Sequence, residues 1–237
     1  MRCARTVTVT IHQPNYLPWL GFFHKMAQAD LLVLLDTVPF TKGGYQNRTR
    51  IRVQEGATWL TVPVLTKGRL GQPTSAVEID TRVPWQRKHL TTLEMNYRKA
   101  PGFAAHWEGL AGVLNQGWER LAPLNESLIR WLAGLLCLNT TICRASDLDA
   151  GGTGSLLLCQ LCVAVGATRY LSGPSGREYL DERVFEGAGI EVQYHEFTPV
   201  PYRQCYPDFV PGLSAMDFVF NEGAARFHEL VVASAAK

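Results

Sequence analysis

Apolar and polar positions are most clearly patterned at the start of the chain, over residues 7–36. A β-branched run at 7–11 is followed by a polar turn, a further apolar segment and a second apolar run at 31–35. This order predicts a strand, a loop, a helix and a second strand, which together form a βαβ unit. The loop carries His12, Gln13, Asn15 and Tyr16, and two prolines within it, at positions 14 and 18, fix φ. Because ligands of parallel sheets gather where strands end, we expect a binding site in this loop.

The rest of the chain continues the α/β pattern. Two β-rich runs predict a hairpin, and apolar spacing predicts helices and further strands. We expect the hairpin at 51–64, helices at 85–97, within 103–138, at 156–165 and at 213–221, and strands at 140–144, 168–172 and 190–197. The predicted fold class is α/β, with a mixed, largely parallel central sheet and flanking helices, built on the N-terminal strand–loop–helix–strand unit. Residues 1–237 form a single domain in this prediction, with a helical insertion at about 85–138.

Polar residues at strand ends and on one helix face are the candidate substrate contacts. Asn47 and Arg48 precede the hairpin, where an arginine either holds a carboxylate or phosphate through two hydrogen bonds or remains a surface charge. A glycine-flanked turn after Ser172 presents backbone N–H groups to an anion, although it lacks the Walker pattern. The predicted substrate-binding residues are Gln13, Asn15, Tyr16, Asp36, Asn47, Arg48, Ser172, Ser175, Tyr179, Asp217 and Asn221.

His89 is the second candidate base after His12. It shares the apolar face of the helix at 85–97 with Trp85, Leu93 and Tyr97, because positions i and i+4 stack. A core histidine whose ring is bonded to a backbone carbonyl is the competing interpretation, since buried polar groups are normally paired.

Composition narrows the class of protein. A hydrophobic content of 46% and a charged content of 19% are typical of a globular protein with a sizeable core. The formal net charge of +2, without a basic block, gives no case for nucleic acid. No apolar stretch reaches the ~20 residues that span a membrane, so we expect no membrane partner and a cytoplasmic location. The Cys159–Cys162 pair lacks the further ligands of a metal site, and two small apolar residues on one helix is the simpler interpretation.

Several stretches, taken together and in order, resemble the WbqC-like family. They are IHQPNYLPWLGFFHKM at 11–26, ADLLVLLD at 29–36, QNRTRI at 46–51, WLTVPV at 59–64, WQRKH at 85–89, YRKAPGF at 97–103, GATRYLSGPSGREYLDE at 166–182 and LSAMDFVFNEG at 213–223. The chain departs from its relatives at 153–156, where Thr-Gly-Ser-Leu stands in place of a charged pair. The substrate contacts that this loop makes in relatives are therefore not carried over to this chain.

The resemblance implies a biosynthetic role in adding acyl or aminoacyl groups to sugars or amines. Within the family, the chain is similar to the enzymes that form the amide of lincosamide antibiotics, where an amino acid leaves a carrier protein for the amine of an amino sugar. The implied partners are an acyl or peptidyl carrier protein and a small amino-sugar acceptor. No cofactor of its own is implied, only the phosphopantetheine arm of the carrier protein. The resemblance also implies a nucleophilic cysteine at Cys162 rather than at Cys205.

Three hypotheses about the chemistry remain open. Amide-forming acyl transfer from a thioester needs a base, which is His12 or His89, and oxyanion donors such as Gln13 or Asn15. It proceeds either through Cys162 or by direct aminolysis. The second hypothesis is a nucleotidyl transferase or ligase-like domain with a HIGH-type loop, although such loops usually hold two histidines. The third is a non-catalytic scaffold that binds a carrier protein.

Overall fold

The computed structural model describes residues 6–232. Its centre is a five-stranded sheet in the order β5-β2-β1-β6-β7, in which every pair of neighbours is parallel. The strands of this sheet are β1 Thr8–His12, β2 Leu31–Leu34, β5 Thr141–Arg144, β6 Arg169–Ser172 and β7 Glu191–Tyr194. The predicted α/β class with a parallel central sheet is confirmed.

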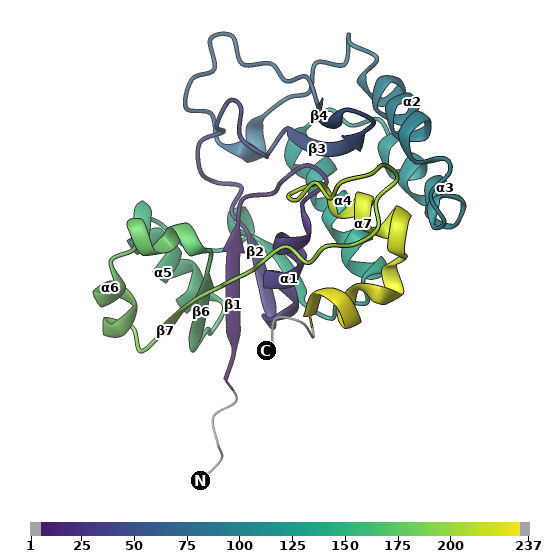
Figure 1. Cartoon of the computed structure of the whole chain (residues 1–237). Coiled ribbons are helices and arrows are strands. Elements are labelled where there is room, and N and C mark those ends of the chain that lie inside the picture. The colour runs from purple at the N-terminus through teal and green to yellow at the C-terminus, as the bar shows by residue number, and fades with distance from the viewer. Residues whose placement is uncertain (1–5, 233–237) are drawn as a thin grey trace.

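Helices flank the sheet and also build a separate group beside it (Figure 1). The α-helices are α1 Leu20–Ala27, α2 Trp85–Tyr97, α3 Phe103–Leu114, α4 Leu121–Leu135, α5 Gly154–Ala164, α6 Glu182–Gly187 and α7 Ala215–Glu222. The short helical turns are η1 Thr74–Ala76, η2 Ala145–Asp147, η3 Pro174–Glu178, η4 Ala224–Arg226 and η5 His228–Val232. A two-stranded antiparallel hairpin, β3 Arg48–Val53 and β4 Gly56–Thr61, lies where the sequence predicts one.

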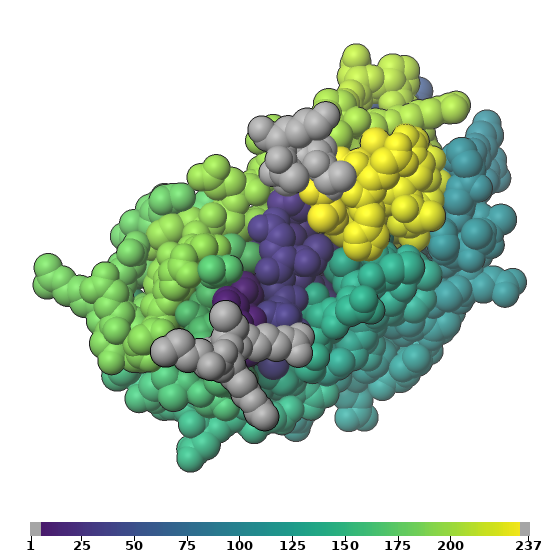
Figure 2. Space-filling view, turned by 90° about the horizontal axis from the view of Figure 1, so that it is seen from below, coloured from purple at the N-terminus to yellow at the C-terminus, as the bar shows by residue number. Residues whose placement is uncertain are grey.

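Alternation along the strands separates two hydrophobic cores. Val9, Ile11 and Val33 pack with α5 and α6 on one face of the sheet. Leu32 and Leu34 pack with α1 and the larger helical group on the other face. Successive side chains of a strand point to opposite faces, which explains this division. Seen from below, the purple segment that runs from β1 to β2 lies between the green α5–β7 region and the teal and yellow helices (Figure 2).

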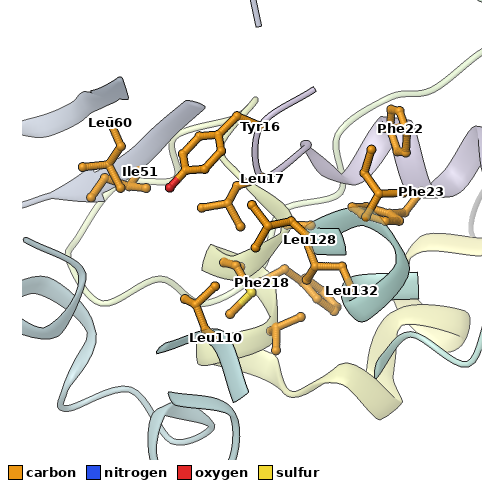
Figure 3. Packing of buried hydrophobic residues seen from close by; sticks show 14 of the residues in the cluster. Tyr16, Leu17, Phe22, Phe23, Ile51, Leu60, Leu110, Leu128, Leu132 and Phe218 are labelled. Atoms are coloured by element: carbon orange, nitrogen blue, oxygen red, sulfur yellow. The ribbon is translucent and has the colours of Figure 1, made fainter. Parts of the chain in front are cut away.

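The loop between β1 and α1 is anchored in the larger core. Tyr16 and Leu17 are 1% and 0% exposed, and the Tyr16 ring points toward Ile51 and Leu60 of the hairpin (Figure 3). Asn125 of α4 fastens the same loop, because its Nδ2 donates to the carbonyls of Pro14 and Gln46 at 2.8 and 2.7 Å. The residues that follow β1 are therefore held rigidly at the end of the sheet.

Some predicted boundaries change for identifiable reasons. β7 ends at Tyr194 rather than at 197, because the chain leaves the sheet there and Phe197 packs edge-on against Trp19 at 5.3 Å. Five cysteines lie among the described residues and are all free, while Cys3 lies outside them. No helix within residues 6–232 is long and apolar enough to cross a membrane.

Candidate active site

A cleft of about 430 Å³ opens at the carboxyl ends of β1 and β6. The chain runs outward from β1 to β2 and β5 on one side, then crosses to β6 and β7 on the other. Parallel sheets bind ligands at such a point, where the direction of winding reverses. The side chains with polar groups that line the cleft are those of His12, Gln13, Lys25, Tyr170, Ser175 and Tyr179. No carboxylate of the described residues lines it.

The cleft exists because β1 and β6 separate early. They pair only through Thr8–Arg169 and Val9–Tyr170. The carbonyl groups of successive residues in a parallel strand point alternately to the two neighbouring strands. The carbonyl of His12 points to the β2 side, where it accepts a hydrogen bond from the Leu35 amide at 2.9 Å. The Ile11 carbonyl therefore faces the gap beside β6. There it accepts a hydrogen bond from Lys25 Nζ at 3.3 Å.

His12 presents a neutral imidazole with a defined tautomer. Its Nδ1 lies 2.9 Å from the carbonyl oxygen of Gln13. Because a carbonyl only accepts, Nδ1 carries the proton and Nε2 keeps its lone pair. Burial lowers the pKa of His12 to about 3, and the charge of Lys25 acts in the same direction. The ring is thus neutral, and its Nε2 is a hydrogen-bond acceptor, throughout the physiological pH range.

Lys25 lines the cleft as well, although the sequence alone did not single it out. Its side chain comes from α1 and is 4% exposed. Burial lowers the pKa of its ammonium group to about 7. The signal lay in α1 itself, where Leu20 to Met26 are buried on every side. A lysine on a helix that is buried all round needs a functional or paired role, because an isolated buried charge is costly.

Gln13 adds an amide to the cleft. Its side-chain oxygen accepts a hydrogen bond from Gln46 Nε2 at 2.9 Å, which fixes the orientation of the amide. The Gln13 NH₂ group is then the donor that remains for a ligand. Within the described part of the chain, no group of three or more His, Cys, Asp or Glu side chains is placed to hold a metal ion.

Comparison with known proteins identifies the family. The WbqC-like protein family matches residues 13–229 of this chain. The chain belongs to the WbqC-like family. The uncharacterized protein Rv1507c of Mycobacterium tuberculosis is similar to it, at 36% identity over 218 residues, which cover 91% of this chain and 94% of that relative. No solved structure matches.

In this WbqC-like protein, His89 lies away from the cleft and beneath the β1–α1 loop. Its Nδ1 lies 2.8 Å from the Tyr16 hydroxyl, and its Nε2 lies 3.2 Å from the carbonyl of Thr61. The carbonyl must accept, so Nε2–H donates and Nδ1 accepts from Tyr16. Both ring nitrogens are used inside the core, and burial lowers the pKa of His89 to about 4. This geometry favours the interpretation of His89 as a paired core histidine.

Replacing Tyr16 by Phe tests that structural role. The variant leaves His89 Nδ1 buried without a donor, so we expect the free energy of unfolding to fall by about 1–3 kcal/mol. Urea unfolding of Tyr16→Phe beside the unaltered chain measures the loss. Turnover should change less than twofold, and a hundredfold loss of turnover with native stability would instead place the Tyr16–His89 pair in the reaction.

Four other predicted contacts have partners within the protein or lie outside the cleft. Asn47 Nδ2 donates to the Val62 carbonyl at 2.9 Å. Arg48 stacks over Trp59 at 4.1 Å and donates to the Gly43 carbonyl. Asp36 accepts from the backbone N–H and the hydroxyl of Ser146 at 2.9 and 2.7 Å, and so ties β2 to the turn after β5. Asn15 is buried and does not line the cleft.

The predicted substrate contacts at the end of β6 and in the turn after it lie in two places, some in the cleft and one in the core. Ser175 and Tyr179 line the cleft, and Tyr179 is 60% exposed. Ser172 is fully buried, and a Cβ atom at Gly176 would meet its Oγ at 2.2 Å. Ser172 therefore packs beneath the turn, while Ser175 and Tyr179 are placed to touch a ligand.

Asp217 and Asn221 belong to a separate network in the helical group. The Asp217 carboxyl accepts hydrogen bonds from the hydroxyls of Tyr97 and Tyr202 at 2.8 and 2.7 Å. Burial raises the pKa of Asp217 to about 6 although these hydrogen bonds act in the opposite direction. Asn221 donates to the Asp217 carbonyl and accepts from the Cys205 thiol. This polar network joins α2, α7 and the 202–205 loop, and neither residue lines the cleft.

Cys162 lies in the smaller core. It is 0% exposed and packs among the apolar residues between α5 and the sheet. Burial raises the pKa of its thiol to about 12, and Cys159 contributes in the same direction. Because the thiolate is the reactive form, this environment disfavours a nucleophilic role.

Proposed function

We propose that this WbqC-like protein forms an amide by transferring an acyl or aminoacyl group from a carrier-protein thioester to the amine of an amino sugar. The observation that supports it best is the free Nε2 of a neutral His12, held in a cleft with a lysine and a free amide. Acyl transfer needs a base and donors for the developing oxyanion in one water-poor place. In this proposal His12 supplies the base, and the NH₂ group of Gln13 supplies a donor for the oxyanion.

The reaction proceeds by direct aminolysis in this proposal. The amine nitrogen attacks the thioester carbonyl carbon, and the carbonyl π electrons move to oxygen. His12 Nε2 takes one proton from the attacking nitrogen. The oxyanion then re-forms the carbonyl, the C–S bond breaks, and the proton on His12 passes to the departing phosphopantetheine thiolate. The products are the amide and the free thiol of the arm.

The cleft also favours the reactive form of the acceptor. An amine acceptor is normally an ammonium ion, which is not a nucleophile. Burial disfavours a cation in the cleft, because a charged group loses its hydration there. The acceptor therefore binds as the neutral amine. Charge on the thioester oxygen in the transition state raises the proton affinity of His12 at the moment when it acts as a base.

Intact-protein mass spectrometry tests the reaction and its route. We expect the chain, incubated with an aminoacyl carrier protein and an amino sugar, to discharge the carrier without forming an acyl adduct on itself. Cys162→Ala should keep at least about half of the activity, since the buried thiol does not react. An adduct that Cys162→Ala abolishes would establish covalent catalysis instead, and no discharge with any carrier-linked donor would end the proposal.

A nucleotidyl transferase is the second candidate, because the cleft lies where doubly wound sheets bind nucleotides. The loop of this chain holds His12, but Pro18 and Phe22 or Phe23 stand at places comparable to those of the histidines in a HIGH-type loop. Thermal stabilisation by ATP with magnesium, without stabilisation by a carrier protein, would favour this candidate over acyl transfer.

A further inference from the structure

Lys25 is a basic side chain in the cleft, and no carboxylate of the described residues lines the cleft beside it. Its side chain is 4% exposed, and its ammonium group donates to the Ile11 carbonyl, at 3.3 Å. None of the ion pairs of the described residues includes it. Two of its three N–H donors are thus available to a ligand. A buried ammonium group gains most from a partner of opposite charge.

The amino end of α5 opens into the same cleft. Gly154, the first residue of this 11-residue helix, lines the cleft together with Lys25. The preceding Thr153 makes no capping hydrogen bond, and the first amide bonded along the helix is that of Leu157, which donates to the Thr153 carbonyl. The amides of residues 154–156 have no acceptor within the helix. Helix amino ends of this kind attract anions.

From this arrangement we propose that the cleft binds the phosphoryl group of its substrate between Lys25 and the amino end of α5, and that the acceptor is an amino sugar that carries a phosphate. The inference rests on the proposed function, because it states which of the two substrates brings the anion. A lysine, a helix amino end and the absence of carboxylates among the described lining residues all favour a doubly charged anion.

The geometry assigns the phosphate to the acceptor rather than to the donor. Lys25 contacts Ile11, which is the residue next to His12. The phosphate subsite is therefore close to the base. In a phosphopantetheine arm, the phosphate and the thioester are at opposite ends of an extended chain, so a thioester at His12 leaves its phosphate far from Lys25. In an amino-sugar phosphate, only one sugar ring separates the amine from the phosphate.

Calorimetric titration without any acyl donor tests this site. The probes are glucosamine 1-phosphate, glucosamine, inorganic phosphate and 4′-phosphopantetheine. We expect glucosamine 1-phosphate to bind at least about tenfold tighter than glucosamine, the size of one charge-assisted hydrogen bond. Lys25→Met should remove that difference, while Lys99→Met, which changes an exposed lysine, should keep it. Inorganic phosphate should compete with glucosamine 1-phosphate on the unaltered chain and on Lys99→Met, but not on Lys25→Met.

Two outcomes would overturn the inference. Equal affinity of the unaltered chain and Lys25→Met for glucosamine 1-phosphate would show that Lys25 holds no phosphate. Tighter binding of 4′-phosphopantetheine than of glucosamine 1-phosphate, lost in Lys25→Met, would assign the subsite to the donor. Because no turnover enters the titration, a failure of acyl transfer and a failure of phosphate binding are distinguished.

Discussion

Replacing His12 by Ala is expected to lower kcat/KM for amide formation by about 10²–10⁴, the usual contribution of a positioned general base. The variant removes the Nε2 lone pair from the cleft but leaves Lys25 and Gln13 in place. Binding of the acceptor should change little, so the loss is expected in kcat. Steady-state rates of carrier discharge, measured over a range of acceptor concentrations, give the two constants separately.

His106→Ala is the matched control for this variant. His106 lies on α3 in the helical group, is half-buried, and does not line the cleft. Its replacement should leave kcat/KM unchanged within twofold. If His12→Ala folds with native circular dichroism and retains full activity, His12 is not the base, and the scaffold hypothesis gains support.

Replacing Lys25 by Met is expected to stabilise the protein at neutral pH by about 2–4 kcal/mol, while it weakens binding of the phosphorylated acceptor. Burial lowers the pKa of Lys25 from its ordinary value of 10.5 to about 7. Between these two pH values the unfolded chain holds a proton that the folded chain does not. The contribution of Lys25 to the free energy of unfolding of the unaltered chain therefore rises with pH over this interval. It is lowest below pH 7.

Urea unfolding of both chains at neutral, mildly alkaline and strongly alkaline pH, across the interval between the two pKa values, measures this dependence. The difference between Lys25→Met and the unaltered chain should shrink steadily as pH rises. Lys99→Met, at an exposed position, should show no such trend. A Lys25→Met chain that is less stable than the unaltered one at every pH would mean that the lysine is paired and stabilising. Active-site residues often lower the stability of a protein, and a buried lysine that does so is consistent with such a role.

The frame of the site could be predicted from the sequence because its signals are local. The run of residues 7–36 predicts β1, the loop and β2, and thereby places His12 and Gln13 at a strand end. Parallel strands need a crossover connection, and the loop that begins it lies at the carboxyl ends of the strands, where ligands bind. The glycine-flanked turn after β6 likewise predicts Ser175 near a ligand.

The remaining predicted contacts could not be sorted from the sequence, because their partners are distant along the chain. Tyr16 and His89 are 73 positions apart in the sequence, yet they form a hydrogen bond with each other in the core. Asp217 meets Tyr97 across 120 positions. Lys25 was missed for a different reason: its apolar neighbours on α1 make it unusual, but they give no sign that β1 and β6 separate beside it. Periodicity shows which face is apolar, but it does not show where two strands part.

A crystal structure of the chain with an amino-sugar acceptor would show whether the cleft between β1 and β6 is the site of transfer. We predict that the acceptor lies in this cleft, with its amine within about 3.2 Å of His12 Nε2, the hydrogen-bond reach of a general base. An acceptor bound elsewhere, for example against Asp217 and Asn221 in the helical group, with the cleft empty, would contradict the proposed site.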